Sequence, residues 1–127
     1  MIDLCGGTCF ILDHCGNYAA HYPNWKQWHD DIANIADHPN VNCKISGICK
    51  TVKPGENQVK ELERAVKHCV SSFGTDRVMF GGDWPVCNNT SSFAGWVATV
   101  KGILHDWSQE DLKKLFHDNA VDFYKLT

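Results

Sequence analysis

The segment FILDHCG, residues 10–16, runs from three apolar residues into an aspartate, a histidine, a cysteine and a glycine. Bulky apolar residues favour an extended strand, and a glycine allows the chain to turn sharply. We therefore predict a strand over residues 8–14 that ends at His14, with the turn at Gly16. Such a strand delivers a titratable side chain to the edge of a sheet, where a ligand can reach it.

The rest of the chain alternates strand patterns with helix patterns. Two further short apolar runs predict strands over residues 41–46 and 77–83. Polar loops are predicted at 17–23 and 49–57. Apolar residues at helical spacing, with caps at their ends, predict helices over residues 24–38, 57–74, 93–104, 108–118 and 119–126. Because each connection between strands contains a helix, we expect parallel strands in an α/β fold that forms a single domain.

The composition excludes several classes of function. The chain has 127 residues, 43% of them hydrophobic, which is enough for one compact domain with a core. Its net charge of −3 argues against a nucleic acid or an anionic membrane as partner. No apolar run reaches the roughly 18 residues of a membrane span, and the first residues lack a signal-peptide pattern. We therefore expect a cytoplasmic protein.

The cysteines are odd in number and follow no repeated spacing. In a reducing compartment, most of them are expected to be small buried hydrophobic residues. An alternative is a zinc site built from Cys5, Cys9 and His14, although the CxxC pair typical of such sites is missing. The seven are Cys5, Cys9, Cys15, Cys43, Cys49, Cys69 and Cys87.

The second predicted strand has two chemically different faces. Side chains alternate along a strand, so Val41, Cys43 and Ile45 share one face and Lys44 lies on the other. The apolar face is expected to pack against helices. Lys44 is then expected to point the other way, toward the inside of a barrel or beneath a second layer.

The same alternation relates the ends of the other two strands. His14 shares a face with Leu12, and Asp83 shares a face with Met79. We predict that His14, Lys44 and Asp83 lie on the same inner side, near one rim. Polar groups at the carboxyl ends of parallel strands mark the usual ligand site of α/β folds.

Each of these residues also has a purely structural interpretation. A histidine at a strand end often only completes local hydrogen bonds. Asp83, which precedes Trp84 and a proline, can bond to its own backbone, and Lys44 can extend into solvent. The coincidence of three polar strand ends favours a functional site over three separate structural roles.

Four segments carry a resemblance to a known family: FILDHCGN (10–17), VNCKISGI (41–48), DRVMFGGDWPVC (76–87) and LFHDNAVDFYKL (115–126). In order and spacing they resemble the C-terminal part of the amidohydrolase-related (amidohydrolase 2) family, in its sugar-lactonase and dicarboxylate-lactonase branch. The combination of LDHCG with FGGDWP is specific, whereas KISG alone is not. The resemblance implies the last three β/α units of a (β/α)₈ TIM barrel.

The resemblance also implies an activity. Family members hydrolyse lactones or related bonds with an activated water, and some bind a divalent metal, often zinc. His14 matches a histidine that ligates the metal or polarises the substrate carbonyl. Asp83 matches an aspartate that deprotonates the attacking water and is a second candidate metal ligand. Trp84 and Lys44 would contact a small-molecule substrate such as a lactone.

The length of the chain departs from the family pattern. A barrel of this kind needs about 250 residues, and this chain has 127. The His-x-His pair of the family's first strand is absent from this sequence, and a catalytic zinc takes three protein ligands. We therefore expect a fragment that needs the missing half of the barrel, supplied by a complementing chain or an oligomer. The alternative is a non-catalytic remnant, or an α/β module that binds a partner.

Overall fold

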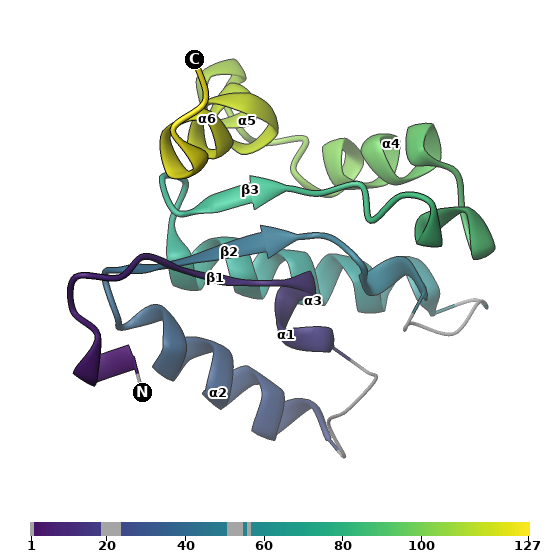
Figure 1. Ribbon diagram of the computed structural model, residues 1–127. Helices are drawn as coiled ribbons and strands as arrows, with labels where there is room; N and C mark the ends of the chain where they lie inside the picture. The colour runs from purple at the N-terminus through teal and green to yellow at the C-terminus, as the bar shows by residue number, and fades with distance from the viewer. Residues whose placement is uncertain (1, 19–23, 51–54, 56) are drawn as a thin grey trace.

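The computed structural model of the protein contains one three-stranded sheet (Figure 1). Strands β1 (Phe10–Leu12), β2 (Val41–Ile45) and β3 (Val78–Phe80) are parallel and lie in the order β1-β2-β3. This confirms the predicted α/β fold with parallel strands in sequential order. The structure describes residues 2–18, 24–50, 55 and 57–127.

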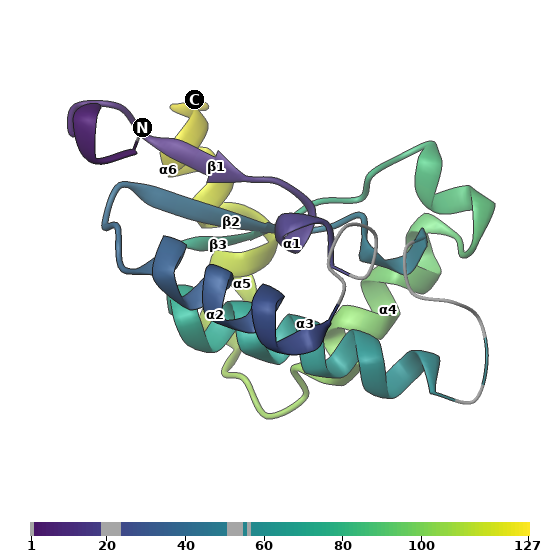
Figure 2. The ribbon, with the colours of Figure 1, turned by 90° about the horizontal axis from the view of Figure 1, so that it is seen from below.

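Helices cover the sheet and connect its strands. Seen from below, α2 and α3 run side by side along the strands, while the segment from α5 to α6 lies beside β3 (Figure 2). The predicted loops at 17–23 and 49–57 fall largely outside the described residues. The bounds are α1 His14–Asn17, α2 Trp25–Ala36, α3 Gln58–Phe73, α4 Phe93–Ile103, α5 Gln109–Lys113 and α6 Asn119–Tyr124, with short 3₁₀ turns at Ile2–Leu4, η2 Ile48–Lys50 and η3 Val86–Asn89.

Several helix starts follow from their capping residues. The side chains of Asn24, Ser92 and Ser108 each accept a hydrogen bond from a backbone N–H in the first turn of α2, α4 and α5. Such a bond satisfies one of the donors that a helix start leaves unpaired. Asn57 precedes α3 as predicted, but its side chain makes no capping bond.

The core lies between the sheet and the helices. Val41, Cys43 and Ile45 of β2 are buried and alternate with less buried residues, as the sequence predicts. Trp28 of α2 is completely buried, and its indole N–H donates to the Cys15 carbonyl at 2.9 Å. Trp96 of α4 fills the other end of the core. Two large aromatic side chains with satisfied N–H groups therefore anchor the helices on the sheet.

The predicted face of the first strand is wrong. Register aligns Phe10 with Val41 and Leu12 with Cys43, and aligned residues of parallel strands point to the same side. Leu12 therefore lies on the helix side of the sheet, not on the Lys44 side. The strand also ends at Leu12, two residues before His14, because the chain enters a turn there.

The third strand is shorter than predicted, but its faces are as expected. It ends at Phe80 rather than Asp83. Met79 aligns with Lys44 in register, and a Cβ on Gly81 would meet the Lys44 side chain at 3.0 Å. Asp83 thus follows a segment whose alternate residues face the same side as Lys44.

The C-terminal segment is one continuous helical run rather than two capped helices. A π-helical stretch at Lys114–Asp118 joins α5 to α6, and Asn119 is not a cap. Instead, the buried Asn119 amide donates two hydrogen bonds of 2.7 Å, to the carbonyls of Thr75 and Val78. This side chain ties α6 to the start of β3. Among the described residues, no helix is long and apolar enough to cross a membrane.

We predict that Asn119→Ala lowers the free energy of unfolding by about 1–3 kcal/mol, because it leaves two carbonyls without their donor. Asn34→Ala, at an exposed position of α2, is the matched control and should change it by less than about 0.5 kcal/mol. Urea unfolding followed by circular dichroism measures both. Equal stability of the two variants would show that Asn119 does not hold α6 to the sheet.

Candidate active site

A left-handed turn presents His14 at the carboxyl end of β1. The backbone φ angle is 55° at His14, 51° at Cys15, 65° at Gly16 and 55° at Asn17, so α1 is not an ordinary α-helix. Non-glycine residues rarely adopt this conformation, and such strain concentrates at functional sites. The turn reverses the direction that strand alternation would give, and it sends the Cys15 side chain into the core while His14 lies at the rim.

The His14 imidazole lies directly over the end of β2. Its Nδ1 is 2.8 Å from Ser46 Oγ, and Ser46 is completely buried. Gly47 has a φ of 68°, and a Cβ at this position would lie 2.5 Å from His14 Nδ1. The KISG segment therefore supplies both a hydrogen-bonding partner and the space that the ring occupies.

Asp83 faces His14 from the end of β3. His14 Nε2 is 3.8 Å from Asp83 Oδ1, which is too long for a hydrogen bond. Asp83 Oδ2 is buried and has no hydrogen-bond partner among the described residues, although Lys50 Nζ lies 3.2 Å away. A buried carboxylate oxygen without a hydrogen bond is uncommon and marks this position for functional scrutiny.

Lys44 lies on the same face but makes different contacts. Its Nζ is 2.7 Å from Asp13 Oδ1 and lies 5.9 Å from the centre of the Tyr124 ring. Burial alone would lower the pKa of Lys44, but the Asp13 carboxylate and the Tyr124 hydroxyl raise it above its usual value. Lys44 is therefore a firmly charged cation beside the site, in contact with neither His14 nor Asp83 in the contacts above.

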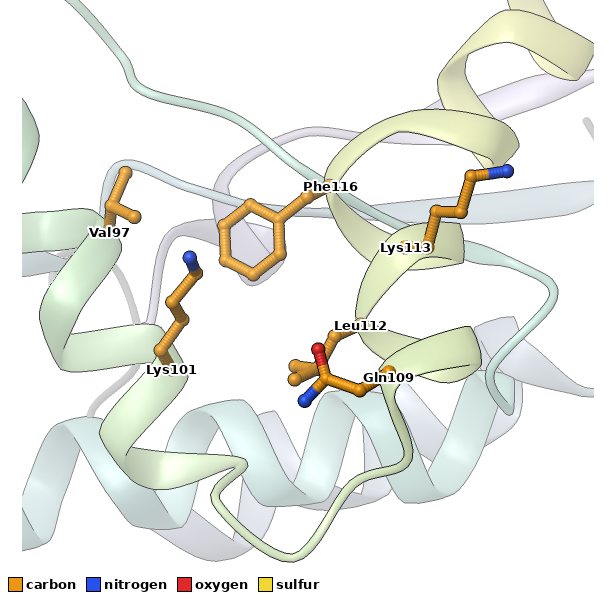
Figure 3. Close-up of a pocket in the computed structure, with 6 residues that line it drawn as sticks. All are labelled: Val97, Lys101, Gln109, Leu112, Lys113 and Phe116. Carbon is orange, nitrogen blue, oxygen red and sulfur yellow. The ribbon is translucent and has the colours of Figure 1, made fainter.

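Trp84 is 70% exposed and directly follows Asp83. Its assignment to substrate binding stays a prediction. A pocket of about 420 Å³ between α4 and the α5–α6 segment lies elsewhere (Figure 3). Its lining contains none of the predicted site residues: Val97, Lys101, Gln109, Leu112, Lys113 and Phe116.

Two neighbours of the site were not predicted as site residues. Ser46 belongs to the KISG segment but was read only as part of the Lys44 face. Lys50 was placed in a loop, and its proximity to Asp83 arises from η2, a turn without a sequence signature. Local pattern signals the ends of strands, whereas a pairing that depends on the path of a connecting turn leaves no such trace.

The zinc site predicted from Cys5, Cys9 and His14 is wrong. Among the described residues, the three potential metal-binding side chains that come together are Cys15, Cys43 and Cys69. The Cys43 and Cys69 thiols donate toward the Cys15 sulfur and lower the pKa of Cys15 well below its usual value. The same contact raises the pKa of Cys43 and of Cys69.

The sequence of the whole chain matches a known protein family. A model of the family described as Amidohydrolase matches residues 1–126. The chain belongs to the amidohydrolase family. Membership confirms the resemblance seen in the strand-end segments.

Two bacterial relatives extend well beyond this chain. An uncharacterised protein, y4mH, from Sinorhizobium fredii is 33% identical over 117 residues, which cover 91% of this chain and 38% of the relative. An L-fucono-1,5-lactonase from Burkholderia ambifaria is 27% identical over 120 residues, which cover 91% of this chain and 41% of the relative. The chain therefore spans about two fifths of the length of these relatives.

Solved amidohydrolases share the fold. A Burkholderia multivorans amidohydrolase with bound HEPES aligns with a TM-score of 0.91 at 24% identity, covering 99% of this chain and 47% of that one. The same protein with bound zinc gives the same values. This fold similarity confirms the predicted part of a TIM barrel: the three β/α units correspond to just under half of such an enzyme.

We predict that Gly47→Ala destabilises the protein by about 2–4 kcal/mol, because alanine combines an unfavourable left-handed φ with a collision against His14. Gly102→Ala in α4 is the matched control, since a Cβ there meets nothing within 4 Å and alanine favours the helix. Chemical unfolding compares the two variants. If Gly47→Ala is as stable as Gly102→Ala, the His14 ring does not lie against Gly47.

Proposed function

We propose that the chain carries part of the active site of a hydrolase that opens a lactone with an activated water. The observation that carries the proposal is the pairing of His14 with Asp83 across 3.8 Å at the rim. A polar separation of this length suits a bridging water. The lactonase among the relatives supports a lactone, or a related C–O or C–N bond, as the reacting group.

Asp83 is the proposed general base. Its Oδ2 is a buried acceptor without a hydrogen bond among the described residues, so it has capacity to take the proton of a water beside it. Its position after a left-handed residue, with φ of 50°, fixes the carboxylate at the strand end. The attacking oxygen then forms a bond to the lactone carbonyl carbon, and the base retains the proton for the ring oxygen that leaves.

His14 and Lys50 are the proposed partners of the developing negative charge. The attack places charge on the carbonyl oxygen, which a positioned N–H donor stabilises most in a partly buried site. His14 Nδ1 contacts Ser46, which leaves Nε2 directed toward Asp83 and the reacting groups. Lys50 Nζ supplies a positive charge 3.2 Å from Asp83 Oδ2.

A divalent metal was predicted at His14 and Asp83, and one solved amidohydrolase binds zinc. The two side chains offer an imidazole nitrogen and a carboxylate, whereas a catalytic zinc takes three protein ligands and a water. Lys50 also brings an ammonium group to the carboxylate that a metal would need. The described residues therefore do not fit a zinc on their own, and no step above uses one.

Substrate contacts are proposed for Lys44 and Trp84. Lys44 carries a positive charge near the rim and Trp84 presents an exposed ring beside Asp83, a pair suited to a polar, sugar-like ring. We also propose that the remaining strands of the barrel, from a complementing chain or a longer protein, complete the substrate pocket. The coverage of about two fifths of each relative supports this.

A cytoplasmic location is proposed as well. All seven cysteines are free thiols, five of them buried. Free thiols are typical of a reducing compartment, where disulfides rarely persist.

The proposed function is tested in a chimera in which this chain replaces the matching segment of the Burkholderia ambifaria lactonase. Hydrolysis of L-fucono-1,5-lactone should be restored by the wild-type segment, and Asp83→Asn should lower kcat/KM by about 10²–10⁴-fold because the base is lost. The matched control is Asp76→Asn, an exposed carboxylate at the opposite end of β3 that pairs only with Lys114 at the surface. It should leave turnover unchanged.

Two outcomes would contradict the proposal. Normal turnover by the Asp83→Asn chimera would exclude Asp83 as the base. A folded chimera without activity, with the wild-type segment, would favour the alternative that the chain is a non-catalytic module that binds a partner.

A further inference from the structure

Three cysteines from separate elements meet in the core beneath the site. Cys15 comes from the left-handed turn α1, Cys43 from the centre of β2 and Cys69 from α3. Their Sγ atoms all lie within 4.8 Å of one another, and none of the three side chains is exposed. We call Cys15, Cys43 and Cys69 the trithiol cluster.

The spacing of the trithiol cluster suits a single ion. A metal–sulfur bond of about 2.3 Å places three sulfurs around an ion roughly 4 Å apart. The observed limit of 4.8 Å is less than about 1 Å wider, a change that side-chain rotation can absorb. Thiolate ligands select soft, thiophilic ions over the hard cations that prefer oxygen.

Neither packing nor a disulfide accounts well for three sulfurs in contact. As small core residues, alanine or valine would fill the same space, and no pattern in the sequence requires three thiols to converge. A disulfide would use two of the sulfurs and leave the third, and all three are free thiols. The one hydrogen bond to a backbone group that the structure gives to Cys15 is long, 3.7 Å to the Lys44 carbonyl.

We propose that the trithiol cluster is a closed site for one thiophilic ion held by three sulfur ligands. A divalent ion such as Cd²⁺ would form three metal–sulfur bonds and release three thiol protons, giving a complex of charge −1. Trivalent arsenic, added as arsenite, would form three As–S bonds and release three waters, giving a neutral complex. Neither step transfers electrons, and the neutral complex suits a buried site best.

The ion would act on the position of His14. Cys15 directly follows His14 in the strained turn, so a bond to Cys15 would tie this turn to β2 and α3. The proposed ion is separate from the substrate site, because the turn sends the two side chains in different directions. The inference therefore stands or falls independently of lactone hydrolysis.

The test uses the full 127-residue chain with the more accessible Cys5 and Cys9 replaced by serine, which removes binding outside the core. Cd²⁺ is titrated while the cadmium–thiolate absorption is recorded, and arsenite is followed by native mass spectrometry. We expect one ion per chain and a rise in Tm with the ion. Cys69→Ala should weaken binding by more than about 100-fold, since it removes a direct ligand.

Cys87→Ala is the matched control, because Cys87 is also completely buried but lies outside the cluster. It should bind as tightly as the parent chain. Failure of both ions to bind the parent at one per chain would overturn the proposal, as would unchanged binding by Cys69→Ala.

A second measurement covers the case in which Cys69→Ala does not fold. The parent chain is partly opened with urea and alkylated with and without the ion, and the modified cysteines are located by mass spectrometry. We expect the ion to protect Cys15, Cys43 and Cys69 but not Cys49 or Cys87. Equal protection of all five buried cysteines would mean that the ion only stabilises the fold, and it would contradict the site.

Discussion

The His14 imidazole rests against Gly47, a backbone position with no room for a side chain. A Cβ there would lie 2.5 Å from Nδ1, and the φ of 68° disfavours any other residue. This close approach, together with the 2.8 Å contact to Ser46, orients the ring toward Asp83 at the end of β3. The rim has its arrangement because three consecutive strand ends are locked together at this one point.

The sequence predicted the sheet better than it predicted the turns. Parallel order, the alternation along β2 and the face of Asp83 all follow from periodicity, which depends only on local geometry. The same reasoning gave His14 the wrong strand face, because four left-handed residues at α1 break the alternation. His14 still reaches the predicted rim, so the conclusion held although the argument for it failed. Lys50 could not be found from its own surroundings in sequence.

The core below the rim has a chemistry of its own. Cysteines that look like ordinary small hydrophobic residues in the sequence lie on a turn, a strand and a helix that only the fold brings together. Trp28 closes the same region by donating to the Cys15 carbonyl. The backbone that carries His14 is thus held from below by packing and hydrogen bonding, and it is the natural place for an ion to influence the site.

The central claim is that His14 and Asp83 act as one unit on the substrate. A double-mutant cycle on kcat/KM in the lactonase chimera, with His14→Gln, Asp83→Asn and the double variant, tests it most directly. If the two residues serve the same water and transition state, the double variant should lose little more than the worse single variant. Losses that multiply, as for two independent residues, would contradict the account.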